Sequence, residues 1–180
     1  MLDIKNCLLV IIDIQDKLVK AGFNGDLCEE KAAKICKAAN ILNIPTIITE
    51  QYPKGLGHTT NAIMTNTADF ATIIEKSSFS AYSESEFHQE LSKSNKKQVI
   101  IAGIELHICV LQTAVDLIKN GYEVFILKDA CTSRNKDEFD TGIELLKQYG
   151  AKITCLEIVL FQLLKSSQNK HFKEIQALIK

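Results

Sequence analysis

Apolar, β-branched segments alternate with helix-like segments along the whole chain, and this rhythm limits the available folds more than any other feature. Strands are predicted over 7–12, 46–49, 71–74, 99–102, 122–127 and 151–154. Helices are predicted over 26–42, 83–91, 107–119, 136–149, 157–164 and 171–179. Strands that are apolar throughout are typical of parallel sheets covered on both faces. The sequence therefore predicts an α/β protein, a three-layer Rossmann-like fold with a mostly parallel six-stranded sheet flanked by helices.

Length and composition indicate a single domain over residues 1–180. The chain has no linker-like or low-complexity tract, and 46% hydrophobic with 24% charged residues is ordinary for a globular protein. The longest apolar runs are too short to cross a bilayer. A net charge of −1 gives no general electrostatic attraction to nucleic acid or to an anionic membrane. We therefore expect a small-molecule partner, with no nucleic acid and no membrane.

The cysteine pattern indicates a reducing compartment. No CxxC pair and no Cys/His ligand spacing occurs, and the N-terminus lacks the features of a signal peptide. Free thiols in the cytoplasm are thus predicted for all six cysteines. They are Cys7, Cys28, Cys36, Cys109, Cys131 and Cys155.

Cys109 follows the predicted strand 99–102, where Gly103 opens an elbow into a helix. Unpaired N–H groups and the helix dipole at such a position favour the thiolate, which is the nucleophilic form of cysteine. Asp13 and Lys76 also follow strand ends, and right-handed crossovers bring these ends to one edge of the sheet. Singly, each has a commoner explanation, as a cap, a solvated charge or a small buried residue. Together they predict a reactive site.

Three segments, 8–15, 75–82 and 103–114, carry a family resemblance. In this order and spacing they resemble the isochorismatase-like cysteine hydrolases, which include nicotinamidases and N-carbamoylsarcosine amidase. Segments 49–57 and 172–175 resemble more specifically the branch of isochorismatase domain-containing proteins. The resemblance covers nearly the whole chain.

The resemblance implies a catalytic triad of Asp13, Lys76 and Cys109. Asp13 would take the thiol proton, Lys76 would hold the charges, and Cys109 would attack an amide-type carbonyl carbon. Backbone N–H groups of Glu105 and Cys109 would form the oxyanion hole. The family's non-proline cis peptide would fall between Ile104 and Glu105. Asp13 would then activate the water that cleaves the thioester.

The resemblance fails at the family's metal site. Nicotinamidases bind a metal through an Asp-x-His motif and a second histidine after the second strand, where this chain has Glu50-Gln-Tyr-Pro. His58 alone is more often an ordinary loop residue than a ligand. We therefore predict no metal and no other cofactor.

Four further residues are expected to bind substrate as pocket walls, although ordinary packing explains each equally well. They are Gln15, Tyr52, Phe79 and Tyr82. The family also implies a homo-oligomer, a dimer or larger.

Three functional hypotheses follow. The first is a metal-independent cysteine hydrolase that cleaves a small amide or carbamoyl-type C–N bond. The second is an isochorismatase-like binding or interaction module whose active site is vestigial. The third, a flavodoxin-like phosphate binder, needs a glycine-rich loop after the first strand, and residues 13–17 contain no glycine.

Overall fold

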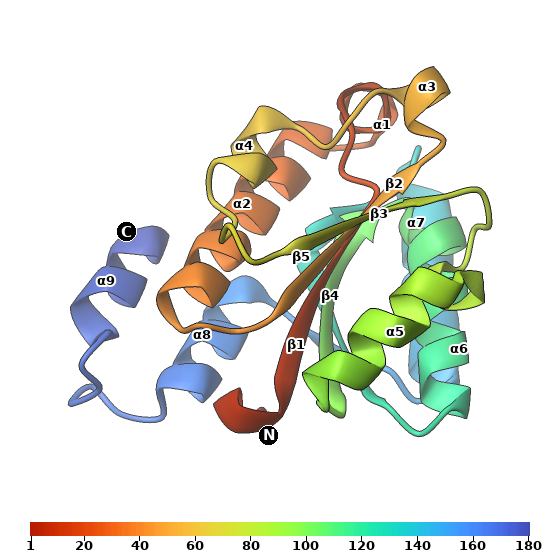
Figure 1. Cartoon of the computed structure of the whole chain (residues 1–180). Coiled ribbons are helices and arrows are strands. Elements are labelled where there is room, and N and C mark those ends of the chain that lie inside the picture. Colours follow the sequence, from red (N-terminus) through yellow and green to blue (C-terminus); the bar gives the residue numbers. More distant parts are fainter.

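A computed structural model describes all residues from Met1 to Lys180 as one parallel sheet with helices on both faces (Figure 1). The strand order is β3-β2-β1-β4-β5-β6, and every neighbouring pair is parallel. This confirms the predicted fold class. The strands are β1 (Cys7–Ile12), β2 (Thr46–Gln51), β3 (Thr72–Lys76), β4 (Gln98–Ile104), β5 (Glu123–Thr132) and β6 (Lys152–Thr154).

Two groups of helices cover the two faces of the sheet. One face is covered by α2 (Gly25–Ile41) and α8 (Leu156–Leu164), with α9 (Phe172–Gln176) outside them (Figure 1). The other is covered by α5 (Ser85–Ser94), α6 (Leu111–Lys119) and α7 (Lys136–Gln148). None of the helices is both long and apolar enough to cross a membrane.

The central strand explains the uninterrupted apolar run near the N-terminus. All six residues of β1 are buried, with Leu9 and Ile11 in one core and Leu8, Val10 and Ile12 in the other. At the edge, β3 has only Ile74 and Lys76 buried. A strand buried on both faces needs apolar residues at every position, whereas an edge strand does not.

The order in which successive strands are added to the sheet changes side between β1 and β4. The chain builds β2 and β3 on one side of β1 and then crosses to place β4 on the other side. In open α/β sheets, ligands bind beyond the carboxyl ends of the strands at such a switch point. Here that point holds the end of β1 and the elbow after β4.

Several boundaries differ from the predictions. β2 continues past the predicted end at residue 49 to Gln51, and the short helix α3 (Pro53–Leu56) follows it. β5 extends past residue 127 to Thr132. The predicted helix 107–119 begins as η3, a π-helical turn over Leu106–Val110. Two short helices, α1 (Asp16–Ala21) and α4 (Asn61–Met64), were not predicted because they span too few residues to show periodicity.

Candidate active site

Asp13 lies at the end of β1 in the left-handed region, with a φ of 52°, and its side chain is fully buried. Thr49 on the neighbouring β2 donates its hydroxyl hydrogen to Asp13 Oδ1 at 2.7 Å. Lys76, at the end of β3, forms an ion pair with Asp13 Oδ2 at 2.7 Å. The structure thus brings together the acid and the lysine, which are 63 residues apart (76 − 13).

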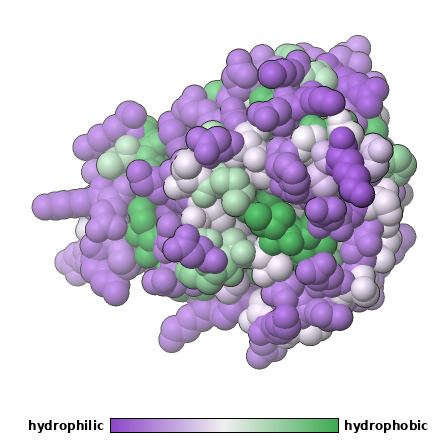
Figure 2. All heavy atoms as spheres, turned by 45° about the horizontal axis from the view of Figure 1, so that its top comes forward, coloured by the Kyte–Doolittle hydropathy of each residue, from purple (hydrophilic) through white to green (hydrophobic).

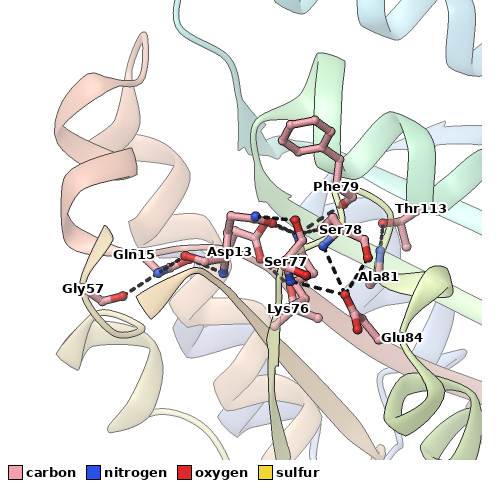
Figure 3. Close-up of polar contacts among 12 residues, drawn as sticks. Asp13, Gln15, Gly57, Lys76, Ser77, Ser78, Phe79, Ala81, Glu84 and Thr113 are labelled. Carbon is pink, nitrogen blue, oxygen red and sulfur yellow. Dashed lines mark hydrogen bonds and ion pairs between the residues drawn. The ribbon is translucent and has the colours of Figure 1, made fainter. Parts of the chain in front are cut away.

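Oxygen atoms surround the Lys76 ammonium group. Besides Asp13, Nζ donates to Gln51 Oε1 at 2.6 Å and to the backbone carbonyls of Ser78 and Phe79 at 3.1 and 3.2 Å (Figure 3). The Lys76 side chain has no solvent exposure. These acceptors replace the water that a buried ammonium loses.

The loop that supplies these carbonyls is braced from α5 and α6. Glu84 Oε1 accepts hydrogen bonds from the backbone N–H groups of Ser77 and Ser78 and, at 2.6 Å, from the Ser78 hydroxyl. The backbone N–H of Ala81 donates to Thr113 Oγ1 at 2.9 Å. Figure 3 shows Glu84 and Thr113 holding the loop from the side opposite to the ion pair.

Cys109 lies in η3, 6% exposed, and faces both Asp13 and the elbow. The Ile104–Glu105 peptide is cis, at the predicted place. The Glu105 backbone lowers the pKa of the Cys109 thiol, and the Glu105 side chain forms an ion pair with Arg134 Nε at 2.5 Å. The thiol, the Asp13 carboxylate and the Glu105 backbone are therefore close enough to influence one another.

The resting charge of the thiol differs from the sequence prediction. Burial and the Asp13 carboxylate raise the pKa of Cys109 to about 12, although the Lys76 charge and the Glu105 N–H oppose this rise. Burial is the largest of these effects. It favours the neutral thiol in the resting site, in contrast to the thiolate expected from the helix position.

Asp13 is suited to accept that proton. Burial raises the pKa of Asp13, against the Lys76 ammonium and the Thr49 hydroxyl, which lower it. A carboxylate with a raised pKa is a stronger base than an exposed one. The pair can thus pass one proton from sulfur to oxygen when the sulfur attacks an electrophile.

Gln15 does not line a pocket. It is fully buried, and its Nε2 donates to the carbonyls of Gln51 at 3.1 Å and Gly57 at 2.5 Å, while Oε1 accepts from the Gln51 N–H at 2.8 Å. Both amide hydrogens are committed to the backbone of 51–57. We therefore correct the sequence interpretation: Gln15 fixes this loop instead of contacting a ligand.

Two of the three aromatic candidates are exposed beyond the carboxyl ends of β2 and β3. Phe79 is 55% exposed, with its carbonyl on Lys76 and its ring turned away from it (Figure 3). Tyr52 is 61% exposed and its ring packs over Gly55. The Tyr82 ring lies tilted against His88, with ring centroids 4.1 Å apart, and packs partly buried against the hydrophobic core. These contacts favour the packing explanation for Tyr82.

The loop histidine pairs with a buried acid. Glu50 Oε2 lies 2.9 Å from His58 Nδ1, and Glu50 Oε1 accepts from the Thr59 N–H at 2.6 Å. The chain places no group of three or more His, Cys, Asp or Glu side chains around a common point. Both Glu50 oxygens therefore serve to hold the loop 50–59.

Thr49, Gln51, Glu84 and Thr113 were not predicted as part of the site. Thr49 and Gln51 are two residues apart on β2, so their side chains share one face, and each bonds a residue predicted for the site. That alternation was a usable signal. Glu84 and Thr113 bind backbone N–H groups of the loop 77–81. Such contacts do not depend on the side chains of the loop, so the sequence pattern does not predict them.

The side chains of the ion pair are closed to solvent, and Cys109 retains 6% exposure. Figure 2, in which the carboxyl edge of the sheet is turned forward, shows apolar atoms gathered near the centre of this face with polar atoms around them. A thiol with a carboxylate nearby is the pair of groups that nucleophilic attack by sulfur requires.

Comparison with known proteins agrees with this geometry. The family model described as "Isochorismatase domain" matches residues 7–158. Isochorismatase family protein 1A of Dictyostelium discoideum is 39% identical over 171 residues, 93% of this chain and 83% of that protein. Isochorismatase domain-containing protein 2 of Danio rerio is 38% identical over 178 residues, 99% of this chain and 89% of that protein.

Solved structures show the same fold. The MAR1 ribonuclease from Caenorhabditis elegans has a TM-score of 0.95 and 35% identity, covering 99% of this chain and 91% of that one. The YcaC gene product from Escherichia coli, described as an octameric hydrolase of unknown specificity, has a TM-score of 0.89 and 23% identity, covering 99% and 94%. The matched segments include the ends of β1 and β3 and the elbow after β4. The chain therefore belongs to the isochorismatase domain family.

Proposed function

We propose that the protein is a metal-independent cysteine hydrolase that cleaves a small amide or carbamoyl-type C–N bond, with Asp13, Lys76 and Cys109 as its triad. One observation carries the proposal. Asp13 Oδ2 pairs with the buried Lys76 ammonium, and the Asp13 carboxylate is close enough to the Cys109 thiol that each group shifts the pKa of the other. A buried base beside a buried nucleophile, with a cation to balance the charge, has no evident structural purpose.

The first half-reaction makes the thioester. The Cys109 S–H proton moves to Asp13 as the sulfur bonds to the substrate carbonyl carbon. The oxyanion that forms accepts hydrogen bonds from the backbone N–H groups of Glu105 and Cys109. As the C–N bond breaks, the proton on Asp13 passes to the leaving nitrogen, and an amine or ammonia departs.

The second half-reaction reverses these roles. Asp13 takes a proton from water, whose oxygen attacks the thioester carbonyl. The tetrahedral intermediate expels the sulfur, which takes back its proton from Asp13. Lys76 keeps its charge throughout, so the buried carboxylate never becomes an isolated anion.

Tyr52 and Phe79 are the proposed walls of the substrate mouth, because both rings are exposed near the ends of β2 and β3. The small exposure of Cys109 supports a small substrate. No metal is needed for this chemistry, and Glu50, which stands where related metal sites have a ligand, is fully used by His58 and Thr59.

Two alternatives remain for the same site. A vestigial binding module would keep the buried ion pair but have an unreactive thiol. The second alternative is ribonuclease activity, which the name of the Caenorhabditis elegans relative suggests. A ribonuclease requires a surface that attracts phosphates. The net charge of −1 gives no general attraction of that kind.

The decisive experiment is a panel of amides, carbamoyl compounds, hydantoins and short RNAs, tested on the wild type and on Cys109→Ala. Ammonia release and an acyl adduct on Cys109, detected by mass spectrometry, are the readouts. Loss of both in the alanine variant supports the hydrolase. Turnover that survives in Cys109→Ala removes the sulfur from the mechanism, and RNA cleavage alone favours the ribonuclease.

We also propose the cytoplasm as the compartment, since all six cysteines are unpaired in the fold. A relative from Phytophthora sojae (strain P6497), 34% identical over 176 residues (96% of this chain, 84% of that protein), is named a secreted effector, so fractionation of the native host is the appropriate test.

A further inference from the structure

Gln51 contacts Lys76 as closely as the catalytic carboxylate does. Its Oε1 lies 2.6 Å from Lys76 Nζ, against 2.7 Å for Asp13 Oδ2. At its other end, Gln51 Nε2 donates to the Ser77 carbonyl at 3.0 Å. The amide is therefore bonded at both ends, once to the lysine and once to the loop that supplies two more of the lysine's acceptors.

The backbone of Gln51 is fixed from β1. Gln15 bonds both the N–H and the carbonyl of Gln51, at 2.8 and 3.1 Å. Two tiers of polar contacts thus join the ends of β1 and β2: Asp13 with Thr49, and Gln15 with Gln51. Lys76 reaches across from β3 and bonds one member of each tier.

A neutral acceptor at this place has an electrostatic consequence. The charged and titratable groups that face Lys76 are Asp13 from β1, Cys109 from η3 and, farther away, Glu84 before α5. Asp13 already balances the ammonium charge. Because Gln51 solvates the ammonium without adding a second negative charge, the lysine retains a positive field at the sulfur.

We propose that Gln51 is a positioning residue for Lys76, holding the ammonium between Asp13 and Cys109 while leaving its charge available to the sulfur anion. This inference rests on the proposed function, which gives the sulfur anion its role. A glutamate of the same shape would cancel that charge. A methionine would remove the acceptor and let the ammonium move.

The test measures the pH dependence of Cys109 alkylation by iodoacetamide, followed by peptide mass spectrometry, and needs no substrate. Gln51→Glu should raise the apparent pKa of the thiol by about one unit or more, so that alkylation at pH 8 slows roughly tenfold. Gln51→Met should shift the profile in the same direction by less. Gln148→Glu, at the exposed C-terminal end of α7, is the matched control and should retain the wild-type profile.

Thermal melts accompany the profiles to separate positioning from folding. If a Gln51 variant melts at a lower temperature but keeps the wild-type pH profile of Cys109 alkylation, the glutamine is purely structural and the proposal is overturned. An unchanged alkylation profile in Gln51→Glu overturns it as well. This outcome is distinct from failure of the hydrolase hypothesis, which the substrate panel on Cys109→Ala tests independently. If Gln51→Glu does not fold, the uncharged methionine variant decides.

Discussion

At the scale of single residues, the carboxylate of Asp13 acts on two neighbours in opposite ways. It stabilises the Lys76 ammonium and, by its negative charge, keeps the proton on Cys109. The same group then removes that proton during reaction. Thiol reactivity and catalytic turnover should therefore respond differently to its removal.

Asp13→Asn tests this separation. The asparagine cannot accept the thiol proton, so hydrolysis should fall by about a hundredfold or more. Simple alkylation of Cys109 at pH 9 should become faster, by about tenfold for each unit that the thiol pKa falls, because the Lys76 charge is no longer balanced. Iodoacetamide kinetics on both proteins provide the measurement. Slower alkylation in the variant would mean that Asp13 promotes ionisation even without substrate.

Lys76→Met should mainly affect stability. It leaves a carboxylate without its cation in a fully buried place, and breaking a buried pair in this way costs about 3–5 kcal/mol. The double variant Asp13→Asn, Lys76→Met removes both charges and should recover most of the loss. Urea unfolding of the two variants checks this. Equal stability of the single and double variants would show that Asp13 becomes protonated when the lysine is absent.

At the scale of elements, the loop between β3 and α5 links the site to a helix that is remote from the substrate. Glu84, directly before α5, binds three donors on Ser77 and Ser78, and the Ser78 hydroxyl bond is the main reason that its pKa is lowered. The loop in turn presents carbonyls to Lys76. A change at Glu84 should therefore reach the site through backbone geometry.

Glu84→Ala should destabilise the protein by about 1–3 kcal/mol and lower the rate of hydrolysis, because Ser77 and Ser78 lose their acceptor. Glu86→Ala, an exposed position in the first turn of α5, is the control and should stay close to wild type. Chemical unfolding and turnover are measured together. The folded state lowers the pKa of Glu84 below its ordinary value of 4.5. The stabilisation by Glu84 should therefore be complete above pH 4.5 and be lost as the pH falls through the lowered pKa, so the stability difference between wild type and Glu84→Ala should shrink at low pH.

At the scale of the whole molecule, the single chain exposes large apolar side chains beyond the ends of β2 and β3, Tyr52 and Phe79 among them. The homo-oligomer that the family resemblance implies would cover such side chains, and it stays a prediction. Size-exclusion chromatography with light scattering should give a multiple of the 20.1 kDa chain mass, and a single species at 20.1 kDa would reject the prediction.

Part of this architecture is visible in the sequence alone. Runs such as 7–12 and 99–102 predict buried parallel strands because each position must be apolar when both faces are covered. Asp13, Lys76 and Cys109 are identifiable because parallel strands end at one edge, and the segments around them resemble a known family. These signals are local to each segment and need no knowledge of what packs beside it.

The tertiary structure alone decided the chemistry within that frame. Burial and the Asp13 charge raise the pKa of the Cys109 thiol, and both depend on segments far away in the chain. Gln15 bonds loop backbone and Tyr82 packs against a core cluster for the same reason, since both contacts come from segments that meet only in the fold. The acceptors around Lys76 come from three loops and strands. Proton affinity and side-chain direction depend on assembled neighbours, which residue spacing does not encode.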